Sequence, residues 1–189
     1  MRIFLAVFPP PATQALAERA IEALRRPGDG VSWVRRENLH YTLRFIGEVG
    51  ADGARRVEEA ARGAVSGRAR FPVALGGAGA FPNSRRARVL WLGASQGAEP
   101  FAALARALES ALAKRGFAPE ERRFTAHLTI GRVREPGRDW AADLAALPAL
   151  EGTEARFEVA SIDVVESRLA PKGSIYTVRA RAELGADGS

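Results

Sequence analysis

The sequence predicts an α+β fold made of two similar lobes that face each other across a cleft, and three observations support this expectation. Strand and helix patterns are mixed along the 189 residues without a strict βαβ alternation, which argues against a doubly wound parallel sheet. Each half of the chain contains a helix pattern and a later strand with the sequence His-x-Thr. The length fits one domain or two small packed lobes. We therefore expect residues 1–184 to form a single bilobal domain and residues 185–189 to be a frayed tail.

Hydrophobic periodicity and turn residues predict the individual elements. The strand patterns cover residues 2–8, 31–34, 39–46, 71–81, 87–95, 127–133, 156–166 and 175–184. The helix patterns cover residues 9–26, 52–65, 98–115 and a short segment near 139–146. Three prolines stand at the entrance of the first helix and "RPGDG" ends it, whereas Gly116 follows the third helix. The linker "PNSRR" between residues 71–81 and 87–95 indicates a pair of strands joined by a turn.

The composition excludes several classes of protein. The chain contains no cysteine, so it has neither disulfides nor thiolate nucleophiles nor thiolate-bound metals. The N-terminal apolar run "IFLAVF" is too short for a signal-peptide core or a membrane span. We therefore expect a cytoplasmic protein that does not associate with membranes.

Positive charge gathers around the two histidines of the chain. The formal net charge is +6 and the sequence pI is about 10.8. Residues 35–44, which include His40, carry three arginines and one glutamate. Residues 122–134, which include His127, carry four arginines and no acid. A GC-rich genome accounts for much of the arginine usage, but the location of the excess charge indicates a ligand that bears phosphate.

The two histidines share the pattern His-x-Thr-apolar. Because alternate side chains of a strand share a face, His40, Thr42 and Arg44 are expected on one face of the first strand. His127 and Thr129 are likewise expected on one face of the second strand. The residues that alternate with them are apolar and suit a core. Two such strands side by side would therefore form a polar surface that carries two imidazoles.

This constellation suits acid–base chemistry at phosphorus. A histidine with an ordinary pKa of about 6.5 serves as acid or base near neutral pH. One neutral imidazole can take a proton from water or a hydroxyl while the other, protonated, donates one to the leaving oxygen. Threonine hydroxyls and an arginine can bind the phosphate oxygens, and no metal or cofactor is required.

Other interpretations of these residues remain open. A single histidine in a strand is more often structural than catalytic, and threonine is common in strands because of its propensity. A metal site would need carboxylate partners, and none lies at ligand spacing in either segment. The stretch "GGAG" at residues 76–79 lacks the lysine of a phosphate-binding loop and indicates a bend or bulge.

The paired "HYTL" and "HLTI" resemble the two HxTx motifs of the two-histidine phosphoesterase superfamily. More narrowly, the chain resembles the bacterial and archaeal RNA 2′,3′-cyclic phosphodiesterases, long called 2′-5′ RNA ligases. The likeness covers nearly the whole chain, through the segments "RIFLAVFPP", "NLHYTLRFIGEV", "RVLWLG", "AHLTIGRVR" and "VVESRLAPKGSIYTV". It implies a bilobal α+β fold with pseudo-twofold symmetry, in which each lobe has an antiparallel sheet with flanking helices and contributes one HxTx strand to the cleft.

The resemblance also implies a role for each site residue. His40 would be the general acid that protonates the leaving ribose oxygen, and His127 the general base that activates water. Thr42 and Thr129 would hold the phosphate, and Arg132 corresponds to a family arginine near it.

The position of the arginine depends on the course of the strand. Strict alternation places Arg132 on the face opposite His127, so Arg132 reaches the cleft only if the strand bends at Gly131. Arg44, expected on the face of His40, is the alternative arginine.

The leading hypothesis is metal-independent hydrolysis of RNA 2′,3′-cyclic phosphate ends to 2′-phosphomonoesters, with reversible 2′-5′ ligation as a side activity. The RNA would include tRNA fragments, and we expect a monomer without a protein partner or cofactor. Two alternatives remain: a phosphodiesterase acting on a small cyclic nucleotide such as ADP-ribose 1″,2″-cyclic phosphate, and a non-catalytic RNA-binding module. Candidates for stacking on a terminal base are Phe81, Trp33 and Tyr176, although each also suits a core.

Overall fold

The structure is a computed structural model that describes residues 1–135, 137–171 and 173–185. Its strands are β1 (Arg2–Val7), β2 (Val31–Trp33), β3 (Tyr41–Glu48), β4 (Phe71–Phe81), β5 (Val89–Gln96), β6 (Leu128–Val133), β7 (Arg156–Val159), β8 (Ser161–Ala170) and β9 (Gly173–Glu183). Its α-helices are α1 (Pro11–Leu24), α2 (Ala51–Val65), α3 (Ala98–Ala113) and α4 (Ala141–Ala145). Short 3-10 helices are η1 (Arg36–Asn38), η2 (Ser84–Arg86) and η3 (Thr153–Ala155). The mixture of helices and strands confirms the predicted α+β class.

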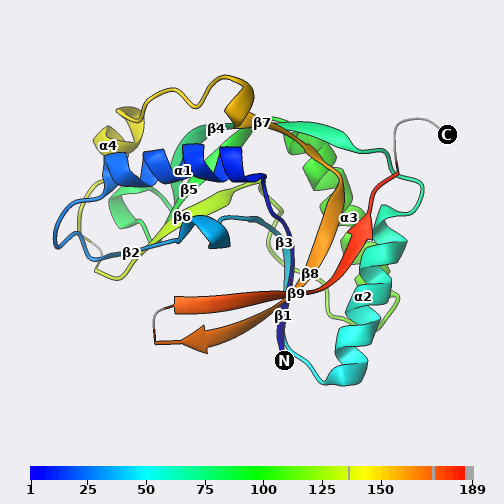
Figure 1. Cartoon of the computed structure of the whole chain (residues 1–189). Coiled ribbons are helices and arrows are strands. Elements are labelled where there is room, and N and C mark those ends of the chain that lie inside the picture. The colour runs from blue at the N-terminus through cyan, green and yellow to red at the C-terminus, as the bar shows by residue number, and fades with distance from the viewer. Residues whose placement is uncertain (136, 172, 186–189) are drawn as a thin grey trace.

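The described strands form one curved sheet with two comparable halves (Figure 1). The order is β7-β4-β5-β6-β3-β1-β8-β9, and β2 pairs with β6 on one side of this path. The halves are joined at the centre, where β3 and β6 run antiparallel and pair through Tyr41 and Leu128. The sheets of the two lobes are thus continuous, and the two His-x-Thr strands are neighbours at their junction.

The helices pack on one face of the sheet, where they enclose the main core. Figure 1 shows α1 lying across one half, while α2 and α3 lie together beside the other half. Leu16, Ala20, Ile21 and Leu24, the predicted apolar stripe of α1, are all buried. On the opposite face of the sheet a smaller cluster of Phe4, Ala6 and Val165 lies on β1 and β8. The large core therefore supports the sheet from one side and leaves the other side for a site.

A bulge interrupts each half of the sheet at the third residue after its histidine. Between β1 and β3, Leu5 pairs with Arg44 and Ala6 with Thr42, so Leu43 has no partner in β1. An extra residue of this kind shifts the alternation of every side chain that follows it.

The same irregularity occurs between β5 and β6. Leu90 pairs with Gly131 and Trp91 with Thr129, so Ile130 is the extra residue in β6. The matching positions of the two bulges support the expected pseudo-symmetry of the lobes.

Three boundaries differ from the sequence-based expectation. Residues 156–166 form two strands instead of one, because β7 pairs with β4 and β8 pairs with β1 in the other half of the sheet. Of the predicted tail, Gly185 forms a parallel bridge with Ala69, and residues 186–189 lie outside the described part of the chain. β3 begins two residues later than predicted and β6 one residue later, directly after His40 and His127.

In the part of the chain that the structure describes, none of the helices combines the length and apolar character needed to cross a lipid bilayer.

Candidate active site

The pairing of β3 with β6 brings the two His-x-Thr motifs together. Tyr41 and Leu128, the residues that pair, are buried in the main core. Continuing this register by one residue in each direction places His40 opposite Thr129 and Thr42 opposite His127. His40 and His127 are therefore diagonal neighbours, and the backbones of such a pair lie about 7–8 Å apart. The site residues predicted from the two motifs therefore meet where β3 and β6 pair.

Each imidazole is oriented by a carbonyl two residues earlier in the chain. Nδ1 of His40 lies 2.6 Å from the carbonyl oxygen of Asn38. Nδ1 of His127 lies 2.7 Å from the carbonyl oxygen of Thr125. Because a carbonyl only accepts hydrogen bonds, Nδ1 carries a proton in both rings and Nε2 is left for chemistry.

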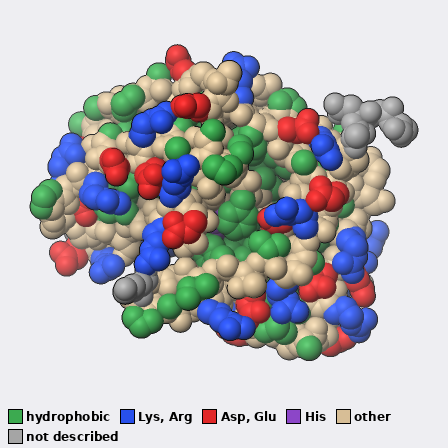
Figure 2. All heavy atoms as spheres, viewed as in Figure 1, with side chains coloured by type: hydrophobic (Ala, Val, Ile, Leu, Met, Phe, Trp, Pro, Cys, Tyr) green, Lys and Arg blue, Asp and Glu red, His purple; other side chains and the backbone are tan. Residues whose placement is uncertain are grey.

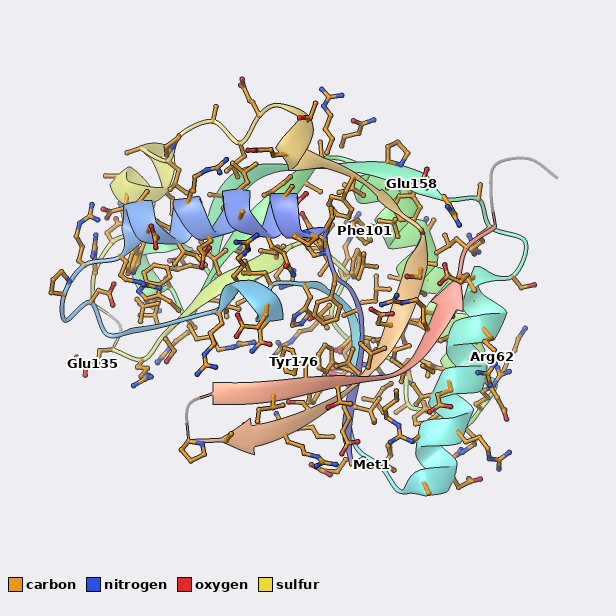
Figure 3. All side chains as sticks on the ribbon, in the orientation of Figure 1. Met1, Arg62, Phe101, Glu135, Glu158 and Tyr176 are labelled. Carbon is orange, nitrogen blue, oxygen red and sulfur yellow. The ribbon has the colours of Figure 1, made fainter. Side chains whose placement is uncertain are left out.

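The hairpin of β8 and β9 completes the surroundings of His40. The amide of Asn38 donates a 2.9 Å hydrogen bond to the carbonyl oxygen of Ser174 in β9. The ring centroid of Tyr176 lies 5.4 Å from that of His40, and Figure 3 shows Tyr176 on β9 close to the central strands. Phe4 and Phe8 lie 4.9 and 5.2 Å from the same imidazole. Three aromatic rings thus shield His40 from water.

His127 has a different set of aromatic neighbours. Phe81 contacts it edge-on, with a centroid distance of 5.0 Å, and Trp91 lies 6.5 Å away. Phe81 and Tyr176, two of the predicted stacking candidates, therefore lie next to the histidines. Trp33, the third, packs against Trp140 at 6.1 Å, so it belongs to another part of the fold. Trp91 was not among the candidates, because an apolar strand gives no sign of which side chain faces a cleft.

Burial and positive charge lower the pKa of both histidines. Removal from water lowers the pKa of His40 to about 4, and the charges of Arg132 and His127 contribute to this decrease. Burial, followed by the charge of Arg132, also lowers the pKa of His127. The unliganded protein therefore favours the neutral form of both rings, and a bound anion would raise their pKa values.

The bulge at Ile130 turns Arg132 into the cleft. Paired residues of an antiparallel ladder share a face, and Arg132 pairs with Val89, two residues from Trp91, which faces the cleft with Thr129. Close packing of β2 against this strand requires a glycine, since a Cβ on Gly131 would lie 2.8 Å from Cγ1 of Val31. The predicted bend near Gly131 therefore exists, and its cause is the extra residue before it.

The equivalent bulge places Arg44 on a different face of β3 from Thr42, contrary to the expectation that Arg44 shares the face of His40, although Arg44 still lines the wall of the cavity described below. Arg44 pairs with Leu5, which belongs to the main core. Its guanidinium lies 2.7 Å from Glu109 and 2.9 Å from Glu120, and its side chain is 11% exposed. Two carboxylates thus neutralise this arginine. Phe45 takes the position in β3 that Arg132 has in β6, and it is 45% exposed.

A cavity of about 970 Å³ lies over the central strands. Its wall includes the side chains of the proposed phosphate site, namely Thr42, His127, Thr129 and Arg132, together with Phe45 and Phe81. Figure 2 shows a hollow in the middle of one face of the molecule, with hydrophobic side chains inside it and charged side chains around it. Among residues 1–135, 137–171 and 173–185, no three His, Asp or Glu side chains are grouped closely enough to hold a metal ion.

A curved antiparallel sheet whose two central strands carry matched His-x-Thr motifs into one cleft defines the two-histidine phosphoesterases. The sequence places the chain within this class: the model of the 2′-5′ RNA ligase superfamily matches residues 9–170, and the chain belongs to that family.

Curated relatives match over nearly the whole chain. An RNA 2′,3′-cyclic phosphodiesterase of Methanothermobacter thermautotrophicus is 38% identical over 94% of this chain and 95% of its own length. Another, from Thermotoga maritima, is 33% identical over 94% of this chain and 92% of its own length.

Solved structures agree with the fold. A protein of Thermus thermophilus superposes with a TM-score of 0.83 at 29% identity, over 100% of each chain. Escherichia coli LigT in complex with 3′-AMP superposes with a TM-score of 0.78 at 27% identity, over 97% of each chain.

Proposed function

We propose that the protein hydrolyses RNA ends that carry a 2′,3′-cyclic phosphate and leaves a 2′-phosphomonoester, without a metal ion. The observation that carries this proposal is the pair of imidazoles on neighbouring strands, each with Nδ1 held by a backbone carbonyl. Two general acid–base groups on neighbouring strands are what the opening of a cyclic phosphodiester requires, and one of them, His127, lines the cavity.

Three side chains bind the phosphate in this proposal. The hydroxyls of Thr42 and Thr129 donate hydrogen bonds to the non-bridging oxygens from the two sides of the strand pair. Arg132 adds a charged donor, and no carboxylate among the described residues forms an ion pair with it. These donors are in place before the substrate arrives, so they stabilise the charge that moves onto the oxygens in the transition state.

Proton transfer is divided between the two imidazoles. Nε2 of His127 takes a proton from water as its oxygen attacks phosphorus. The bond from phosphorus to the ribose 3′ oxygen breaks, and His40 donates a proton to that oxygen. His40 must be protonated for this step, and the anionic phosphate favours the protonated form by raising its pKa.

The substrate is inferred from the relatives. Those of Methanothermobacter and Thermotoga are named RNA 2′,3′-cyclic phosphodiesterases, and solved LigT structures include complexes with 3′-AMP, phosphate, NADP+ and ATP. The positive charge around the site suits an RNA chain. We include tRNA fragments among the substrates, and we propose that the protein acts in the cytoplasm as a monomer.

The deciding experiment is incubation of an oligonucleotide that ends in a 2′,3′-cyclic phosphate with the protein in excess EDTA. The expected product is a 2′-phosphomonoester, identified by its resistance to a 3′-specific phosphatase. A cyclic mononucleotide and ADP-ribose 1″,2″-cyclic phosphate serve as competing substrates. Binding of RNA without consumption of the cyclic end would contradict the proposal, and a higher kcat/KM on the small substrates would change its substrate.

A further inference from the structure

Asn38, the residue whose carbonyl holds His40, also has a side chain that reaches another part of the sheet. We propose that Asn38 is a positioning residue, because its side-chain amide fixes the backbone carbonyl that keeps His40 in the orientation and tautomer of a general acid. This inference rests on the proposed function, in which His40 protonates the leaving oxygen. It gives a role in the reaction to a side chain that acts only through His40.

The carbonyl that holds His40 stands at the end of a short helix. Asn38 is the last residue of η1, and a backbone hydrogen bond from Leu39 to Arg36 closes the single turn of this helix. The last carbonyl groups of a helix have no partner within it. The carbonyl of Asn38 is therefore available to accept the hydrogen bond from Nδ1 of His40, over 2.6 Å.

The side-chain amide of Asn38 connects this segment to the edge of the sheet. β9 is the last strand in the order of the described sheet, so one side of its backbone has no strand to pair with. The carbonyl of Ser174 in β9 accepts a 2.9 Å hydrogen bond from the amide of Asn38. These two residues are 136 positions apart in the chain. The hydrogen bond therefore joins the segment before β3 to the β8–β9 hairpin, and it holds the backbone of Asn38 in place.

The same hydrogen bond places an aromatic ring against His40. Tyr176 lies two residues after Ser174 in β9, and its ring meets the imidazole of His40 edge-on, with a centroid distance of 5.4 Å. Tyr176 also meets Phe4 edge-on at 5.0 Å. The side chain of Asn38 thus supports two contacts of the imidazole, namely the acceptor at Nδ1 and, through the hairpin, the ring beside it.

The carbonyl that holds His127 is not fixed in this way. It belongs to Thr125, whose side chain forms no hydrogen bond within the described parts of the chain. His127 lines the large cavity, whereas three aromatic rings enclose His40. Water can replace a lost acceptor at an open ring more easily than at an enclosed one. The imidazole that depends more on its carbonyl is therefore the one whose carbonyl is fixed by a side chain.

A fixed carbonyl favours the protonated imidazole that a general acid requires. Burial lowers the pKa of His40 to about 4, and the hydrogen bond to the carbonyl of Asn38 opposes this decrease. The charged and titratable side chains that face the ring, among the described residues, are Arg132 and His127 on β6 and Tyr176 on β9, and the first two lower the pKa further. A charged donor forms a stronger hydrogen bond than a neutral one, so the carbonyl stabilises the imidazolium more than the imidazole.

The test uses Asn38→Ala, with Gln14→Ala as the matched control. The amide of Gln14 donates a 3.3 Å hydrogen bond to the carbonyl of Leu39, one residue further along the same segment. Its loss removes a comparable hydrogen bond and leaves that of Asn38 intact. Because the chain contains only two histidines, nitrogen NMR of the imidazole rings resolves both of them in the whole protein. At a pH well above the pKa of both rings, and without substrate, the wild type should show the Nδ1–H tautomer in each.

In Asn38→Ala we expect the Nε2–H tautomer of His40 to appear, while His127 keeps its wild-type signals. On a cyclic-end RNA, kcat should fall about tenfold to a hundredfold with little change in KM, the usual cost of misplacing a reacting group. The decline of kcat on the alkaline side should begin at a lower pH, because the imidazolium of His40 loses its acceptor and its pKa decreases. Gln14→Ala should match the wild type in its tautomers, its kcat and its pH profile.

An unchanged tautomer of His40 in Asn38→Ala would overturn the proposal, and so would a changed tautomer without a fall in kcat. Equal changes in Gln14→Ala would also overturn it, because they would reflect a general loosening of the segment. If the wild type consumes no cyclic end, the proposed function fails, and the tautomers alone decide whether Asn38 orients His40. Should Asn38→Ala not fold, Asn38→Ser keeps a polar side chain that is too short to reach Ser174, and the same changes are expected.

Discussion

The half of the molecule around His40 and the half around His127 have the same backbone design and different surroundings. Both histidines stand directly before a central strand, both donate Nδ1–H to a carbonyl two residues earlier, and both are followed by a bulge. His40 lies among three aromatic rings, whereas His127 lies beside two aromatic rings and an arginine. The shared backbone places the two imidazoles alike, and the neighbouring side chains give each a different environment, to which the proposed function assigns different roles.

Removal of each imidazole in turn is the strongest test of whether both halves of the molecule take part in catalysis. We expect His40→Ala and His127→Ala each to lower kcat on a cyclic-end RNA by about a thousandfold, within the usual range for a general acid or base. Affinity for the RNA, measured by fluorescence anisotropy, should change little, because the phosphate donors remain. Retention of more than a tenth of the activity by either variant would show that the two halves do not share the proton transfers.

The burial of His40 should make the stability of the protein depend on pH. The unfolded chain takes up a proton on this histidine near pH 6.5, but the folded protein does so only near pH 4. Stability is therefore complete above pH 6.5 and falls as the pH decreases toward 4, by up to ~3 kcal/mol. Urea unfolding of the wild type and of His40→Gln at several pH values measures this effect. Equal slopes in the two proteins would assign the pH dependence to other groups.

Substitution of the arginines in the two central strands should affect different quantities, catalytic efficiency for Arg132 and stability for Arg44. Arg132→Ala is expected to lower kcat/KM by about tenfold to a hundredfold, the usual effect of losing one charged hydrogen bond, with little change in unfolding free energy. Arg44→Ala should lower the unfolding free energy, because Glu109 and Glu120 lose their shared partner. The opposite result would mean that Arg44 holds the phosphate after all. Arg86→Ala, an exposed arginine in η2, is the control for general loss of charge.

The smallest effect is expected at the glycine that permits close packing next to Arg132. Gly131→Ala brings a methyl group into contact with Val31, which we expect to lower the unfolding free energy by about 1–2 kcal/mol. Arg132 moves with the strand, so kcat/KM should fall as well. Gly50→Ala, where an added Cβ meets no atom within 4 Å, is the matched control. Full stability of Gly131→Ala would show that β2 can move aside.

The sequence predicted the site better at its histidines than at its arginines. Period-two alternation correctly placed His40 with Thr42 and His127 with Thr129, because these residues precede the bulges. It failed for Arg44, since a bulge arises from the register with a neighbouring strand that is distant in sequence. For the same reason, residues 156–166 read as one strand although they pair with two different halves of the sheet. Local patterns identify a strand, and only its partners decide which way its later side chains point.

The hydrogen bonds that hold Nδ1 of both histidines have a consequence for successive turnovers. Neither ring can rotate to exchange its proton elsewhere, so every proton enters and leaves through Nε2. In the proposed reaction, one turnover leaves His127 charged and His40 neutral, the reverse of the starting arrangement. Under that proposal, the original state is restored at the two Nε2 atoms, by way of the departing phosphate or of water that replaces it, so the protons return on the same side by which the product leaves.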